Sequence, residues 1–442
     1  MDRPQALVRP LEAQWQGVLD DVLRPMRGGP QLTTKDVARL GPKVAELSRA
    51  YNQAEAEGRR TKLPLEARIA FSFPRDVPKG AAAVRELVAS GAVKVPADRP
   101  LRVLDLGAGL GAMTWGLVRA LAASGAAGQV DAVLVDEDAE ALEAARAIGR
   151  AARAVLGTEP IDLRLATEVR SLGAVSSGAS AVEARAPYDV VILGQVLSEI
   201  DPRADPATRL ERQAALVTDV LDRTVAPDGA LVIVEPALRE RTRHLHALRD
   251  RVLAGGAATV FAPCLHAATC PMLAVETEWC HEDLPVDLPP WTVPLARAAG
   301  LRWQGLTFSY LVLRKDGRTQ AAGAAGDHAV RFRAVSDLLR SKGKIELFIC
   351  REDGLRQRIR RLDRDAGGGR GVPFEDLRRG DVVTLSSAAE TAPLGGALAT
   401  PAVEASAGGD TRADDAPAPP IDERGRVSAK ANVAIDVAAA RK

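Results

Sequence analysis

The feature that most constrains the fold is an apolar run that ends in a glycine-rich turn, RVLDLGAGLG at residues 102–111. Val103 and Leu104 are typical of a buried strand. The next residues, Asp105, Gly107, Gly109 and Gly111, predict a turn, and a helix is expected to begin near Ala112. Glycine lets a ligand approach the backbone, and a helix N-terminus offers it free N–H groups. The turn is therefore a candidate nucleotide-binding loop, although a turn that binds nothing has the same composition.

Further strands alternate with helices downstream. AVLVD predicts a strand that ends on Asp136, whose carboxylate can accept hydrogen bonds from both hydroxyls of a ribose. More strands are expected at 162–166, 188–193 and 230–234, with a PDG turn at 227–229, and helices at 139–156, 206–223 and 237–253. The last helix is basic and is expected to be a solvated surface helix. The alternation predicts an α/β fold with a doubly wound, mostly parallel, Rossmann-like sheet and a ligand at the carboxyl ends of its strands.

The glycine spacing alone leaves the cofactor open. Gly107, Gly109 and Ala112 also satisfy the G-x-G-x-x-G/A pattern of dinucleotide-binding proteins, so an NAD-dependent dehydrogenase is one hypothesis. The combination of DLGAGLG, an acid that ends the second strand, YDVVIL and PDGALVIVEP resembles class I S-adenosylmethionine-dependent methyltransferases. That resemblance implies that Asp105 and the glycines hold the methionine and ribose side of S-adenosylmethionine, and that Asp136 holds the ribose.

The cysteines form a second candidate site. Three of the four lie within 17 residues, in FAPCLHAATCPMLAVETEWC, as Cys264, Cys270 and Cys280, and the fourth is Cys350. Four thiolates can hold zinc or an iron–sulfur cluster. Structural zinc sites usually pair their ligands two to four residues apart, and none of these cysteines is so paired. A zinc site that includes His266 or His281, two disulfides, and a nucleophilic Cys264 stay open as alternatives.

A basic segment follows. Residues 331–380 carry 14 Lys or Arg against 8 Asp or Glu. Strands are expected at 344–350 and 355–362, with a hairpin turn between them. Two-residue alternation would put Arg356, Arg358 and Arg360 on one face. Such a face suits RNA phosphates, and it also suits an ordinary solvated strand.

The order of four blocks carries a closer resemblance. APCLHAATCP, TEWCHEDLP, TFSYLVLRK and SKGKIELFICREDG resemble the methyltransferase-like proteins of the mitochondrial small ribosomal subunit and their bacterial relatives, over roughly residues 60–380. The resemblance implies a role in small-subunit assembly or maturation, with the subunit and its rRNA as partners. It also implies a 4Fe–4S cluster, with zinc as the alternative, held by Cys264, Cys270, Cys280 and Cys350. An active rRNA methyltransferase is favoured over a non-catalytic assembly factor, but the chain has no Asn-Pro-Pro-Tyr type motif and no catalytic residue is assigned.

The expected domains are a helical N-terminal domain at 1–95, a methyltransferase-like domain at 96–315 and a basic β-hairpin appendage at 328–385. A disordered tail is expected at 386–442, where Ala, Pro, Gly and acidic residues dominate, so truncation near Ala389 should leave stability unchanged. The formal net charge of +1 confines any nucleic-acid surface to a local patch. The sequence has no apolar run near the ~20 residues that span a bilayer and no apolar core of a signal peptide. We therefore expect a cytoplasmic monomer without a membrane partner, whose thiols stay reduced.

Overall fold

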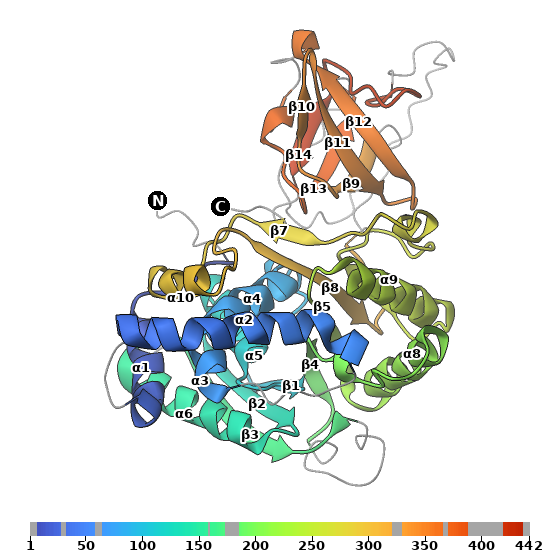
Figure 1. The fold of residues 1–442 in the computed structure, drawn as a ribbon. Coiled ribbons are helices and arrows are strands. Elements are labelled where there is room, and N and C mark those ends of the chain that lie inside the picture. The colour runs from blue at the N-terminus through green and yellow to red at the C-terminus, as the bar shows by residue number, and fades with distance from the viewer. Residues whose placement is uncertain are drawn as a thin grey trace, which may run out of the picture. The chain divides into compact units, whose positions relative to one another are not determined.

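The computed structural model describes residues 7–27, 32–57, 64–157, 160–172, 185–320, 329–365, 370–387 and 419–435. These residues form two compact units (Figure 1). The first contains the described residues as far as Gln320, and the second contains those from Ala329 onward. Across the part of the chain that is described, no helix is both long and apolar enough to cross a membrane.

An eight-stranded sheet forms the centre of the first unit. Its strands are β1 (Leu101–Leu106), β2 (Gly128–Asp136), β3 (Ile161–Val169), β4 (Tyr188–Gly194), β5 (Val225–Glu235), β6 (Thr259–Ala262), β7 (Glu282–Leu284) and β8 (Leu306–Arg314). The order is β3-β2-β1-β4-β5-β8-β6, and β7 pairs with β8. Neighbours from β3 to β5 run parallel, whereas β8 runs antiparallel to β5. The predicted doubly wound, mostly parallel sheet is confirmed.

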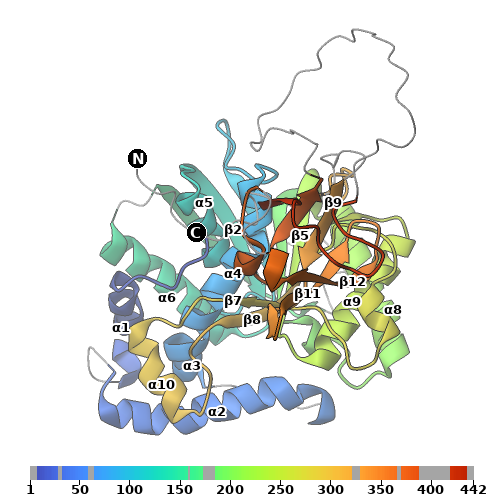
Figure 2. The ribbon, with the colours of Figure 1, turned by 90° about the horizontal axis from the view of Figure 1, so that it is seen from above.

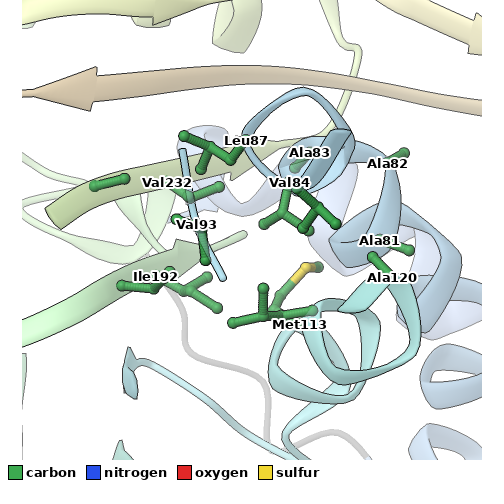
Figure 3. Close-up of a cluster of buried hydrophobic side chains, with 14 of the residues drawn as sticks. Ala81, Ala82, Ala83, Val84, Leu87, Val93, Met113, Ala120, Ile192 and Val232 are labelled. Atoms are coloured by element: carbon green, nitrogen blue, oxygen red, sulfur yellow. The ribbon is translucent and has the colours of Figure 1, made fainter. Parts of the chain in front are cut away.

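Helices cover both faces of this sheet, which is why its central strands are almost continuously apolar. They are α1 (Gln14–Arg27), α2 (Thr34–Glu57), α3 (Leu65–Ala67), the π-helical turn η1 (Arg68–Ser72), α4 (Phe73–Ala89), α5 (Ala112–Ala123), α6 (Ala139–Leu156), α8 (Pro206–Arg223), α9 (Arg239–Ala254) and α10 (Val293–Ala298). On one face, Leu87 of α4 and Met113 of α5 pack against Ile192 and Val232 of the sheet (Figure 3). Residues of α8 and α9 cover the other face.

The N-terminal region is helical, as predicted, and it shares its core with the sheet domain. Trp15 of α1 meets Trp115 of α5 edge to face, with ring centroids 4.9 Å apart. Helix α4 crosses α5 closely, because a Cβ at Gly116 would lie 2.5 Å from the carbonyl oxygen of Val77. Helix α2 lies beside α10 (Figure 2). Since α1 also packs on α6, these helices reach the edge of the sheet that carries the glycine loop.

Two local predictions in the sheet are wrong. Asp105 belongs to β1 and not to the turn after it, and residues 227–229 lie within β5 and do not form a turn. The pairing register between β4 and β5 shifts between Tyr188 and Val190. A Cβ at Gly229 would lie 2.9 Å from the carbonyl oxygen of Tyr188. The glycine therefore permits an irregular but continuous strand, as in a β-bulge.

The second unit contains a six-stranded antiparallel sheet. Its strands are β9 (Ala329–Ala334), β10 (Leu339–Ser341), β11 (Lys344–Arg351), β12 (Arg356–Leu362), β13 (Val382–Ser386) and β14 (Asn432–Ile435). The order is β10-β11-β9-β13-β14, and β12 pairs with β11. The predicted hairpin is confirmed as β11 and β12. Phe332, Ile349 and Phe374 are among the fully buried residues of its core.

The prediction of a disordered tail is wrong for residues 419–435. Strand β14 pairs antiparallel with β13, and Val427 and Val433 are only 0% and 2% exposed. Gly425 approaches β12 so closely that a Cβ there would lie 2.4 Å from the carbonyl oxygen of Arg358. The apolar residues of this segment are sparse and without periodicity, so nothing local marks them as core. The tail residues 388–418 and 436–442 lie outside the described residues.

Candidate functional site

The loop between β1 and α5 is held in a left-handed conformation by its glycines. The φ angles of Gly107, Gly109 and Gly111 are +72°, +51° and +77°. These angles carry little cost for glycine and a substantial one for other residues. Gly111 precedes the first turn of α5 without any side-chain cap, so that turn keeps N–H groups for a ligand. The loop therefore has the form predicted from the sequence.

Asp136 lies beside this loop. One carboxylate oxygen accepts a hydrogen bond from the Gly109 N–H at 2.8 Å, and the other accepts one from the Asp138 N–H at 2.8 Å. Because each carboxylate oxygen has two lone pairs, both can still accept a ribose hydroxyl. The structure thus brings together Asp136 and the glycine loop.

Asp105 lies two residues before the loop and is fully buried, at 0% exposure. Its Oδ2 accepts a hydrogen bond from the Thr114 hydroxyl at 2.7 Å. Its Oδ1 is buried and has no hydrogen-bond partner among the described residues. Burial raises the pKa of this carboxyl to about 7. A buried acceptor without a donor is costly, so this oxygen suits a ligand that donates to it.

A cavity of about 930 Å³ opens at the carboxyl ends of the parallel strands. Gly107 and Asp136 line one side, and the 199–205 loop with the start of α8 lines the other. Its charged lining consists of Asp136, Glu137, Glu199, Asp201 and Asp205, with Arg170, Arg203 and Arg212. The carboxylates outnumber the guanidinium groups, so the lining favours a cationic ligand. Such a position, at the edge where strand order reverses, is where ligands bind in open α/β sheets.

Helix α9 is more than the solvated surface helix that the sequence predicted. Arg249 is only 1% exposed and donates hydrogen bonds to the carbonyl oxygens of His266 and Ala268. Arg243 donates to four carbonyl oxygens of the following loop, those of Met272, Leu273, Val275 and Glu278. These arginines therefore shape the cysteine-bearing loop. The only sequence signal was their density just before a loop rich in proline and cysteine.

The backbone at two cysteines is fixed by the same helix. The Cys270 N–H donates to Asp250 at 2.9 Å, and the Cys280 N–H donates to Nε2 of His246 at 3.1 Å. Burial lowers the pKa of His246 to about 3, so its ring is neutral and accepts this bond. Burial, followed by the charge of Cys264, raises the pKa of the Cys270 thiol to about 12. Cys264 and Cys270 therefore lie near each other.

The four cysteines are divided between the two units. All four cysteines are free thiols, which contradicts the disulfide alternative. In the described ranges, no group of three or more His, Cys, Asp or Glu side chains is arranged to hold a metal ion. Cys350 belongs to the second unit, on β11 opposite Arg356.

Three of the four arginines of β12 share one face of the strand. Arg356, Arg358 and Arg360 pair with Cys350, Phe348 and Glu346 of β11. The fully buried Ile359 points to the opposite face. The Arg356 guanidinium lies 4.7 Å from the centroid of the Phe348 ring. Arg358 is exposed, and its Nε lies 3.6 Å from a carboxylate oxygen of Glu346.

The comparison with protein families decides the identity. The model of the family described as "Mitochondrial small ribosomal subunit Rsm22" matches residues 67–368, which is more than half of the chain. The chain belongs to the Rsm22 family. The match covers the glycine loop, the cysteine-bearing loop and the β11–β12 hairpin. A search of the curated proteins found no match.

Solved structures that are similar to this Rsm22-family chain include methyltransferases. One is an S-adenosylmethionine-dependent methyltransferase from Agrobacterium tumefaciens, at 15% identity and a TM-score of 0.30. The match covers 53% of this chain and 62% of that one, so this chain spans less than two thirds of its length. Another is the plantazolicin methyltransferase BpumL in complex with a monoazolic desmethylPZN analog and SAH, at 10% identity and a TM-score of 0.30. That match covers 63% of this chain and 98% of the other.

Proposed function

We propose that this chain is an S-adenosylmethionine-dependent methyltransferase that acts on small-subunit rRNA during assembly of the small ribosomal subunit. The observation that carries the cofactor assignment is the buried Oδ1 of Asp105, which has no donor among the described residues and lies two residues before the glycine loop. The ammonium group of the cofactor's methionine part is a donor of the right charge. Membership of the Rsm22 family supports the ribosomal partner.

The charge of the cavity supports S-adenosylmethionine over a dinucleotide. Its sulfonium and ammonium groups are cationic, and carboxylates outnumber guanidinium groups in the lining. A pyrophosphate would meet net repulsion from the same lining. Gly107, Gly109 and Gly111 would cradle the methionine part, and Asp136 would hold the ribose. S-Adenosylmethionine supplies an electrophilic methyl group, while the chain's own residues bind and orient it.

Calorimetric titration with S-adenosylmethionine, S-adenosylhomocysteine and NAD tests the cofactor. Asp136→Ala removes a charged acceptor worth about 1.5–3 kcal/mol, so affinity should fall about 10- to 100-fold. Asp131→Ala, five residues earlier on the same strand, is the matched control and should bind normally. A parent protein that binds NAD and neither sulfur ligand would contradict the proposal.

Mapping of rRNA methylation tests the reaction. A deletion strain should lack one small-subunit methyl group, and the parent gene should restore it while the Asp136→Ala gene should not. If the parent gene and the Asp136→Ala gene both restore subunit assembly, and rRNA methylation is the same in all strains, a non-catalytic assembly factor is favoured. This second function is supported by the sequence, which has no Asn-Pro-Pro-Tyr type motif for amino methylation. The cytoplasmic location and monomeric state stay predictions.

We also propose that Cys264, Cys270, Cys280 and Cys350 hold a structural 4Fe–4S cluster. The donor set fits, since iron–sulfur clusters take cysteine thiolates, and α9 fixes the backbone at Cys270 and Cys280. Burial acts to lower the pKa of Arg249, but the negative charge of Cys264 and Asp250 outweighs this and raises it. The guanidinium can therefore offset the charge of nearby thiolates. Zinc is the alternative, and metal analysis after anaerobic purification separates the two.

Arg356, Arg358 and Arg360 are proposed to contact RNA phosphates. Their support is a shared strand face that leaves Arg358 well exposed. Each phosphate contact should steepen the salt dependence of RNA binding. Replacing Arg358 by Gln should therefore weaken binding and reduce the salt slope, whatever the RNA sequence.

A further inference from the structure

Arg68 lies next to the glycine loop although it comes from the N-terminal helices. Its Nη1 is 2.6 Å from Oδ2 of Asp138. Its Nη2 is 3.0 Å from the position that a Cβ on residue 109 would occupy, and Oδ2 of Asp136 is 4.0 Å from the same position. The Arg68 guanidinium therefore lies on one side of a point above Gly109. The Asp136 carboxylate, which is expected to hold the ribose, lies on the other.

The surrounding structure holds Arg68 in place. Arg68 is the first residue of the π-helical turn η1, and the next residues, Ile69 and Phe71, are buried in the N-terminal core. Turns of this kind are rare and frequently occur at functional sites. Glu66 of α3, two residues before Arg68, forms an ion pair with Arg39 of α2. The Arg68 side chain is only 15% exposed, so its guanidinium has little freedom.

The pair with Asp138 leaves part of the guanidinium available. Asp138 uses Oδ1 to cap α6, accepting from the N–H groups of Glu140 and Ala141, and Oδ2 to accept from Nη1 of Arg68. An arginine has five N–H donors in a planar fork that matches a carboxylate. The Nη2 edge, which faces the point above Gly109, can donate to a ligand while Nη1 stays on Asp138.

A bound nucleoside would bring an anion to this point. With its ribose on Asp136, the 5′ substituent of the nucleoside extends over the glycine loop toward the N-terminus of α5. In S-adenosylmethionine that substituent is an amino acid, and its carboxylate is the only anionic group of the cofactor.

We propose that Arg68 is a cofactor-binding residue that recognises the carboxylate of the amino-acid part of S-adenosylmethionine. This inference rests on the proposed function, since it assumes the same cofactor on Asp136. It assigns the N-terminal helices a role in cofactor selection, because they supply Arg68, a cation that flanks the point above Gly109. The competing interpretation is a structural ion pair of Arg68 with Asp138 that never touches the ligand.

Two ligands that differ at the amino acid separate these interpretations. S-Adenosylhomocysteine has the carboxylate, whereas 5′-methylthioadenosine has the same thioether and nucleoside but no amino acid. Both are titrated calorimetrically into the full chain and into Arg68→Met. We expect Arg68→Met to bind S-adenosylhomocysteine at least about 10-fold more weakly, as the loss of a charge-assisted hydrogen bond implies. Affinity for 5′-methylthioadenosine should change less than twofold.

Asp138→Asn is the matched control for the ion pair. Asparagine still caps α6, and Arg68 keeps its charge, so affinity for S-adenosylhomocysteine should be retained. Equal losses for both ligands in Arg68→Met, or the same loss in Asp138→Asn, would overturn the assignment in favour of the structural pair. If Arg68→Met does not fold, Arg68→Lys should give a smaller loss with the same ligand selectivity.

The parent protein distinguishes failure of this inference from failure of the proposed function. A parent that binds neither adenosine ligand would refute the cofactor site and Arg68 with it. If the parent binds both ligands and Arg68→Met binds each of them with the same affinity as the parent, only the role of Arg68 is refuted.

Discussion

Removing the last described segment should unfold the second unit. A truncation after Ala389 deletes β14 together with Ile421, Val427 and Val433, which are all buried against β9 and β13. Each such side chain contributes about 1.5–3 kcal/mol when fully buried. Together the three contribute about 4.5–9 kcal/mol, and a domain has only about 5–15 kcal/mol of net stability. Loss of all three, with the β13–β14 hydrogen bonds, therefore removes most or all of the stability of the unit.

Single substitutions give a measurable version of the same prediction. Val427→Ala removes two buried carbons, so the free energy of unfolding of the second unit should fall by about 2 kcal/mol, from about 0.8 kcal/mol per methylene plus a cavity term. Amide exchange of Val383 and Leu385 on β13 should then be about 30-fold faster if these amides exchange by unfolding of the unit. Glu423→Ala, at an exposed position of the same segment, is the control. Unchanged protection of β13 in the truncated protein would refute the reasoning.

Three further predictions concern the two candidate sites. Gly109→Val should abolish S-adenosylhomocysteine binding in a calorimetric titration, because its Cβ would lie 3.0 Å from Arg68, whereas Gly125→Val, with similar backbone strain but open space, should bind normally. Burial raises the pKa of Asp105 and of Glu235 to about 7, so their contribution to stability is complete below about pH 4 and is lost as the pH rises to 7. The free energy of unfolding in urea should therefore depend less on pH over this window for Asp105→Asn than for the parent. Cys280→Ser should lower the iron content of anaerobically purified protein from about four per chain to well below it; one stoichiometric zinc in colourless parent protein would contradict the cluster.

The sequence was sufficient for the sheet and for the meeting of Asp136 with the glycine loop. Strands such as 132–136 carry apolar runs whose period is set by the backbone, and parallel strands bring their carboxyl ends to one edge. Loop and acid can therefore be placed together without any knowledge of side-chain packing. The shared face of Arg356, Arg358 and Arg360 on β12 was also predictable, because alternation along a strand assigns each side chain its face.

The residues that sequence reasoning missed depend on long-range partners. Arg249 looks like any surface arginine until the carbonyl oxygens of His266 and Ala268 are placed against it. Arg68 is 70 residues from Asp138, and no local pattern connects them. Val427 and Val433 become core residues only because β9 and β13 provide an apolar face for them.

Helix α9 connects the cavity at the carboxyl ends of the strands with the cysteine-bearing loop. On one side, Arg243 and Arg249 bind the carbonyl oxygens of the loop. On the other, His244 hydrogen-bonds Gln213, whose amide donates to the carbonyl oxygens of Leu197 and Ile200 beside the cavity. Glu235, just before α9, accepts from the Leu197 N–H at 3.0 Å. Because buried polar groups are costly to leave unpaired, these bonds fix the cavity wall and the cysteine-bearing loop to α9. Neither can move far from this helix without leaving buried polar groups unpaired.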